Sequence, residues 1–68
     1  MVLGARIREL REARGLTREA LAQKINMSTI FVRKLEAGER TPSLDTLDRL
    51  ARALGVTLKI ELVERRSR

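Results

Sequence analysis

The segment INMSTIFVRKLEAG, residues 25–38, places basic side chains next to bulky apolar ones. If this segment is helical, Val32 and Leu35 fall on one side and belong to a core. Ile30, Arg33 and Lys34 then fall on the opposite side. Arginine and lysine bind phosphates and guanine edges, and an apolar side chain can contact a thymine methyl group. The spacing therefore predicts a helix with one buried face and one face suited to double-stranded DNA.

The charge balance of the 68-residue chain agrees with a nucleic-acid partner. Lys and Arg total 15 against nine Asp and Glu, which gives a formal net charge of +6. A basic chain suits nucleic acid or an anionic membrane surface. No apolar run approaches membrane-spanning length and the N-terminus lacks a signal-peptide core, so we expect no membrane partner and a cytoplasmic location. Phe31 is the only aromatic residue, whereas single-strand binders usually stack bases on several rings, which favours duplex DNA.

The residue types argue against an enzyme. The chain has no cysteine and no histidine, which removes disulfides, the commonest metal ligands and the usual general base. We find no nucleophile–base pair and no phosphate-cradling glycine loop. A possible carboxylate cluster is interpreted as solvated surface, and it comprises Asp45, Asp48, Glu61 and Glu64. We therefore predict no catalytic residue, no metal site and no cofactor.

Capping residues divide the chain into short helices. Thr17, Ser28 and Ser43 each precede a helical pattern, where a side-chain oxygen caps the first turn. Residues that tolerate a left-handed backbone follow each pattern, namely Gly15, Asn26, Gly38 and Gly55. These signals predict four helices, at about 3–14, 18–25, 28–37 and 44–54. The second and third, joined by a brief turn at Asn26 and Met27, would form a helix-turn-helix.

The apolar periodicity predicts which side chains form the core. The expected inward positions share helical spacing, and they are Leu3, Ile7, Leu10, Leu21, Ala22, Ile25, Val32, Leu35, Leu44, Leu47, Leu50, Ala51 and Leu54. A chain this short has a thin core, so oligomerisation is the expected support. A helical bundle that is stable on its own is the alternative.

The C-terminal segment changes period. Leu58, Ile60 and Leu62 alternate with polar residues, which predicts a β-strand over 57–64 in preference to a fifth helix. The chain holds no second strand-like segment, and unpaired strand edges recruit another chain. We therefore expect this strand to pair with its copy in a homodimer. The predicted units are a helix-turn-helix domain at 1–56, a dimerisation strand at 57–64 and a frayed basic tail at 65–68.

The stretch LTREALAQKINMSTIFVRKLEAGERTPSLDTLDRLARALGV resembles the Cro/CI-type (XRE-type) helix-turn-helix family. The shared pattern is a Thr cap, an apolar residue followed by Ala, a turn residue, a Ser cap and Leu-Glu-x-Gly. These elements stand at Thr17, Leu21–Ala22, Asn26, Ser28 and 35–38, and the resemblance covers about 3–56. It implies a mostly α, four-helix, lambda-repressor-like bundle, to which the C-terminal strand is added.

The resemblance also implies roles for individual residues. The family reads bases from positions held here by Thr29, Ile30, Arg33 and Lys34. The family's usual glutamine at the start of the second helix is replaced by Arg18, for which a phosphate contact is expected. The full set of expected DNA-binding residues is Arg18, Ser28, Thr29, Ile30, Arg33, Lys34, Arg40 and Thr41. Arg11 and Glu36 match a structural ion pair of the family.

Two functions remain open at this point. The first is a sequence-specific transcription regulator, a repressor in particular, that binds an inverted-repeat operator as a homodimer. The second is an antitoxin that neutralises a partner toxin and autoregulates its operon, because the C-terminal tail resembles the HipB-type repressors. Two plainer interpretations of the third helix also stand. In the first, Arg33 and Lys34 are ordinary solvated surface residues that contact no DNA. In the second, the exposed Ile30 forms part of a contact with another protein.

Overall fold

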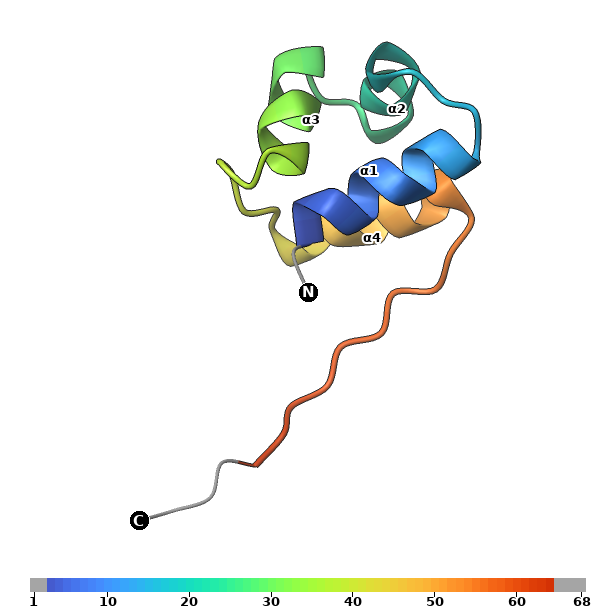
Figure 1. Cartoon of the computed structure of the whole chain (residues 1–68). Coiled ribbons are helices and arrows are strands. Elements are labelled where there is room, and N and C mark those ends of the chain that lie inside the picture. Colours follow the sequence, from blue (N-terminus) through green and yellow to red (C-terminus); the bar gives the residue numbers. More distant parts are fainter. Residues whose placement is uncertain (1–2, 65–68) are drawn as a thin grey trace.

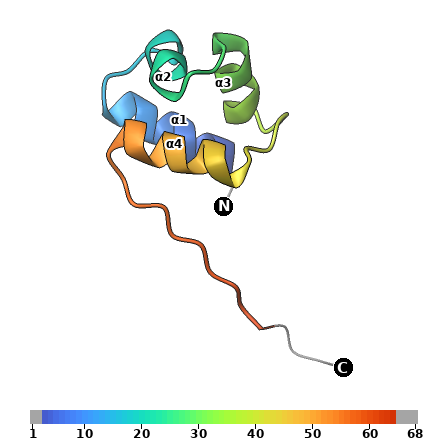
Figure 2. The same cartoon turned by 180° about the vertical axis from the view of Figure 1, so that it is seen from behind.

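The computed structural model describes residues 3–64, and four α-helices form its body. They are α1 (Leu3–Ala13), α2 (Arg18–Ile25), α3 (Thr29–Glu36) and α4 (Leu44–Leu54). Helices α1 and α4 lie side by side, and α2 and α3 lie together on one side of that pair (Figure 1 and Figure 2). The predicted helices are confirmed to within two residues at each end. None of the helices in this described part is long and apolar enough to cross a membrane.

Side-chain oxygens begin three of the helices, as predicted. Thr17 accepts a hydrogen bond from the Ala20 amide at 3.0 Å, and Ser28 accepts one from the Phe31 amide at 3.0 Å. Ser43 does the same for α4. Asn26 ends α2 with φ of 58°, a left-handed conformation that asparagine tolerates better than most residues. The Met27 amide then donates to the Ala22 carbonyl at 2.9 Å, which closes the turn into α3.

The core forms where the four helices meet, and most of its predicted members are buried. It comprises Ile7, Leu21, Ala22, Ile25, Val32, Leu35, Leu50, Ala51 and Leu54, with Leu10 and Leu47 partly buried against it. Two predicted members are wrong. Leu3 is exposed, and Leu44 keeps 69% of its surface accessible. Each is the first residue of its helix, and helical side chains lean toward the N-terminus, so no turn of the same helix covers these two side chains.

Gly4 allows α1 to approach the C-terminal end of α3 closely, which the apolar pattern did not indicate. Gly4 is buried within the first turn of α1. A Cβ atom at this position would collide with the Leu35 carbonyl oxygen and lie 2.7 Å from that of Glu36. Only a residue without a side chain permits this approach, because real Cβ atoms do not come so near backbone oxygens.

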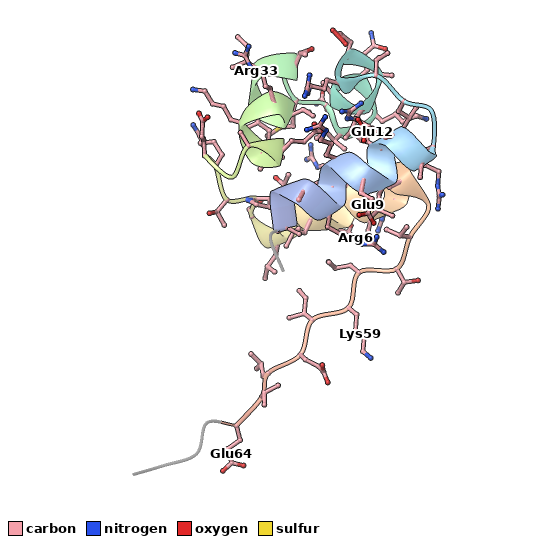
Figure 3. All side chains as sticks on the ribbon, viewed as in Figure 1. Arg6, Glu9, Glu12, Arg33, Lys59 and Glu64 are labelled. Carbon is pink, nitrogen blue, oxygen red and sulfur yellow. The ribbon has the colours of Figure 1, made fainter. Side chains whose placement is uncertain are left out.

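The C-terminal tail, residues 57–64, is extended and leaves the body on the side of α1 and α4 (Figure 1 and Figure 2). Figure 3 shows Lys59 and Glu64 on this segment, away from the helices. The described residues contain no strand and no fifth helix here. The predicted strand is therefore not formed within one chain, because a strand needs a hydrogen-bonded neighbour and the chain supplies none. The predicted frayed tail at 65–68 lies outside the described residues.

We expect Gly4→Ala to destabilise the fold, although alanine normally favours a helix by about 1 kcal/mol over glycine. The added methyl group must displace the backbone at the end of α3, and such overpacking typically costs about 1–3 kcal/mol. Urea denaturation measures the change in the free energy of unfolding. Ala5→Gly, at the exposed neighbouring position, is the matched control and should follow helix propensity alone. A Gly4→Ala protein as stable as the parent would contradict the close approach.

Candidate nucleic-acid interface

Helix α3 buries one face and presents the other to solvent. Val32 and Leu35 are buried on the side of α3 that packs against α1 and α2, so the side opposite to them faces away from the body. Ile30 on that side keeps 58% of its surface exposed, which is high for a large apolar side chain. Arg33 is exposed as well and projects from α3 away from α1 and α4 (Figure 3). Lys34 is partly buried one position further along.

A hollow of about 430 Å³ lies between the start of α2 and the outward face of α3. It brings together four of the predicted DNA-binding residues, from two separate helices. Its lining consists of Arg11, Thr17, Arg18, Glu19, Thr29, Ile30 and Arg33. The hollow therefore combines two exposed or partly exposed guanidinium groups with two threonine hydroxyls, an apolar side chain and the carboxylate of Glu19. Such a set can bind a phosphate and contact base edges at the same time.

The remaining predicted residues lie outside this hollow. Ser28 is exposed, and its hydroxyl is occupied as the cap of α3. Arg40 and Thr41 line a second hollow, in the loop between α3 and α4. The Arg40 guanidinium lies 5.6 Å from the centre of the Phe31 ring, a cation–π distance. Phe31 itself is partly buried and packs against the core.

Arg11 and Glu36 form a buried ion pair between α1 and the last residue of α3. Arg11 donates from Nε to Glu36 Oε2 at 2.6 Å and from Nη2 to Oε1 at 3.1 Å. It also donates from Nη1 to the Leu16 carbonyl at 2.8 Å. Only 3% of the Glu36 side chain is exposed. The hydrogen bonds that Arg11 donates to Glu36 raise the pKa of Arg11 above its ordinary value, although burial acts in the opposite direction.

Glu36 has a second arginine partner, which the sequence did not indicate. Arg18 donates from Nε to Glu36 Oε1 at 3.1 Å, while 40% of the Arg18 side chain remains exposed. Arg18 was expected to contact phosphate only. Its position at the start of α2 gives no sign of a partner at the end of α3. Periodicity within one helix cannot reveal a contact that depends on how two helices are packed.

Two further arginines bind the carbonyl ends of helices. Arg14 donates to the Leu54 carbonyl at 2.8 Å, and Arg49 donates to the Ile25 carbonyl at 3.2 Å. Cations are favourable at helix C-termini, where carbonyl groups lack helical partners. The sequence holds no local signal for these pairs, since 40 and 24 residues separate the partners. Part of the basic character thus stabilises the fold and is not free for a ligand.

Comparisons with known proteins agree with this geometry. A family model described as helix-turn-helix, HTH_3, matches residues 7–60. The chain therefore belongs to the helix-turn-helix family of the Cro/CI (XRE) type, and the resemblance inferred from the sequence is confirmed. The immunity repressor protein of Bacillus phage phi105 is 41% identical over 56 residues, which cover 82% of this chain and 39% of that protein.

Two other proteins point the same way. The HTH-type transcriptional regulator DdrOP3 of Deinococcus deserti is 41% identical over 58 residues, covering 85% of this chain and 45% of the regulator. The chain thus spans less than half the length of both these curated relatives. The crystal structure of the restriction-modification controller protein C.AhdI from Aeromonas hydrophila superposes with a TM-score of 0.79 at 40% identity. That match covers 81% of this chain and 83% of C.AhdI.

We expect Glu36→Leu to destabilise the protein by about 3–5 kcal/mol, because it leaves the buried Arg11 without its carboxylate. The double variant Arg11→Met/Glu36→Leu should lose less, since both charges are then absent. Urea denaturation compares the free energies of unfolding. As a control, Glu12→Leu removes a carboxylate from an exposed pair with Arg8 and should cost under about 1 kcal/mol. A double variant no more stable than Glu36→Leu would refute this account of the ion pair.

Proposed function

We propose that this protein is a sequence-specific transcription regulator, a repressor in particular, that binds duplex DNA as a homodimer. The observation that carries the proposal is the outward face of α3, where Ile30 and Arg33 remain exposed although α3 is anchored by buried Val32 and Leu35. An apolar side chain in water is unfavourable on its own, and the thymine methyl groups of a major groove give it a partner.

The contacts divide into base reading and backbone positioning. Thr29, Ile30, Arg33 and Lys34 are assigned to bases, because they lie on the projecting part of α3. Arg18, Arg40, Thr41 and Ser28 are assigned to phosphates, because they flank that face. The hollow shared by Arg18 and Arg33 supports this division, since it places a backbone contact beside a reading contact. The net charge of +6 supports attraction to the duplex as a whole.

The C-terminal tail is assigned to dimerisation, which divides the chain into a DNA-binding unit up to residue 56 and a dimerisation segment at 57–64. Leu58, Ile60 and Leu62 share one side of the extended tail, and Leu62 is 99% exposed. Pairing with a second copy would cover these side chains and supply the missing strand partner. The tail leaves the body on the side opposite α2 and α3, so a second copy there leaves the reading face open (Figure 1 and Figure 2).

The names of relatives support a repressor, because the phage relative is an immunity repressor and another is a transcriptional regulator. Those names give no support to the antitoxin alternative. A two-fold homodimer presents two α3 helices, which matches an inverted-repeat site.

Selection of bound duplexes from a random pool tests the proposed function. We expect an inverted repeat with half-sites about 34 Å apart, one helical turn of DNA. Arg33→Ala or Lys34→Ala should then reduce discrimination between the selected site and a mutated site by about 1–3 kcal/mol if that residue reads a base. Arg40→Ala should weaken binding to both sites alike. Equal affinity of the native protein for selected and random duplexes would rule out a specific reader.

Truncation tests the dimerisation segment. A chain ending at Val56 should form dimers less readily, unfold at a lower temperature and bind the selected duplex more weakly. Sedimentation, thermal unfolding and fluorescence anisotropy measure these effects. A full-length chain with Leu58, Ile60 and Leu62 changed to serine is the matched variant, because it keeps the length and removes the apolar face. An unchanged dimer in both variants would place the interface elsewhere.

A further inference from the structure

Glu36 shares one carboxylate between two guanidinium groups. Oε2 accepts from Arg11 Nε at 2.6 Å, whereas Oε1 accepts from Arg11 Nη2 and from Arg18 Nε, both at 3.1 Å. Within this cluster, two positive charges meet one negative charge. Arg11 is buried with Glu36, so the surplus positive charge is carried by Arg18, the more exposed of the two arginines.

The contact with Glu36 restricts how Arg18 can turn. A guanidinium group is planar, so a bond at Nε limits both its position and the orientation of its plane. In the described part of the chain, Arg18 donates from Nε to Glu36, and its two Nη groups make no hydrogen bond. Arg18 also lines the hollow with Thr29, Ile30 and Arg33, so the Nη edge is available there. A cation held in place before binding loses less conformational entropy when it meets its ligand.

We propose that Glu36 is a positioning residue for DNA binding, which holds Arg18 by Nε so that its Nη edge binds a backbone phosphate in the hollow between α2 and α3. This inference rests on the function proposed above and names a contact within it. Glu36 then has two roles, as the structural partner of Arg11 and as the residue that positions Arg18. The buried ion pair that joins α1 to α3 and the phosphate contact at the start of α2 then share one carboxylate.

A purely structural role for Arg18 is the competing explanation, and the two differ in DNA binding. If Arg18 only completes the Glu36 cluster, its removal lowers stability without changing how affinity depends on salt. If Arg18 binds a phosphate, Arg18→Ala should lower the slope of log affinity against log salt concentration by about 0.9. It should also weaken binding about tenfold, alike for all sequences, as loss of a charged hydrogen bond does. Arg52→Ala, which removes an equal charge from the exposed face of α4, is the matched control.

A double-mutant cycle tests the dependence on Glu36. Arg11→Met/Glu36→Leu removes the carboxylate without leaving Arg11 unpaired, so the fold is retained, and thermal unfolding verifies this. Arg18→Ala is introduced into the native chain and into this double variant, and affinity for the selected duplex is measured by anisotropy. We expect the tenfold effect to fall below about threefold in the double variant, because contacts that share a partner are not additive. An equal or larger effect there would overturn the proposal.

A conservative variant and a spectroscopic measurement complete the test. Lys has a single cationic group, which cannot bind Glu36 and a phosphate with separate edges, so Arg18→Lys should bind duplex nearly as weakly as Arg18→Ala. In the free protein, the Nε–H proton of Arg18 should exchange with water more slowly than that of exposed Arg33, which has no hydrogen-bond partner in the described part of the chain, and only when Glu36 is present. Fast exchange in the native protein would overturn the proposal without any DNA. Native protein that binds no duplex would instead overturn the proposed function itself.

Discussion

The contact between α1 and the C-terminal end of α3 determines the direction in which the outward face of α3 points. Gly4 brings the two backbones together, and the Arg11–Glu36 pair joins the same two helices through side chains. A buried ion pair contributes little net stability compared with apolar packing, but it tolerates few geometries. Its value here lies in orientation: Ile30 and Val32 lie about 200° apart around the short helix α3, so a rotation of α3 would turn Ile30 away from its outward position and begin to move Val32 out of the core. The capped turn at Asn26 and Ser28 limits the angle between α2 and α3 from the other end.

The arginines of this protein divide into two groups with different tasks. Arg11, Arg14 and Arg49 bind carboxylate or carbonyl groups of the protein, and these bonds hold separate helices in place. Arg33 and Arg40 keep their guanidinium groups at the surface, although Arg40 also lies over the Phe31 ring. Arg18 belongs to both groups. A net charge of +6 therefore overstates the charge that is free to meet a ligand, because part of it is already bound within the fold.

The proteins that this chain resembles carry the same helix-turn-helix unit within chains of different length. The chain spans 39% and 45% of two curated relatives, so those proteins contain sequence with no counterpart here, whereas it covers 83% of C.AhdI. The four-helix body, with its close superposition on C.AhdI, is therefore the common part. The extended tail, by contrast, has no neighbouring strand to pair with in the described part of one chain. Ile60 and Leu62 are exposed, and keeping apolar side chains in water has an unfavourable free energy. This is the physical reason for proposing that the tail pairs with a second copy of the chain.

The sequence by itself determined the local structure: the caps at Thr17, Ser28 and Ser43, the left-handed residue Asn26, and most of the core on each helix. These features depend on neighbours within a turn or two, so spacing reveals them. The Arg11–Glu36 pair and the four-helix bundle came from the family pattern, which carries tertiary information that periodicity lacks. Only the tertiary structure decided that Gly4 must be small, that Leu3 and Leu44 stay exposed, and that Arg18 shares Glu36. Each of these depends on how separate helices are packed, and no single helix encodes that in its own spacing.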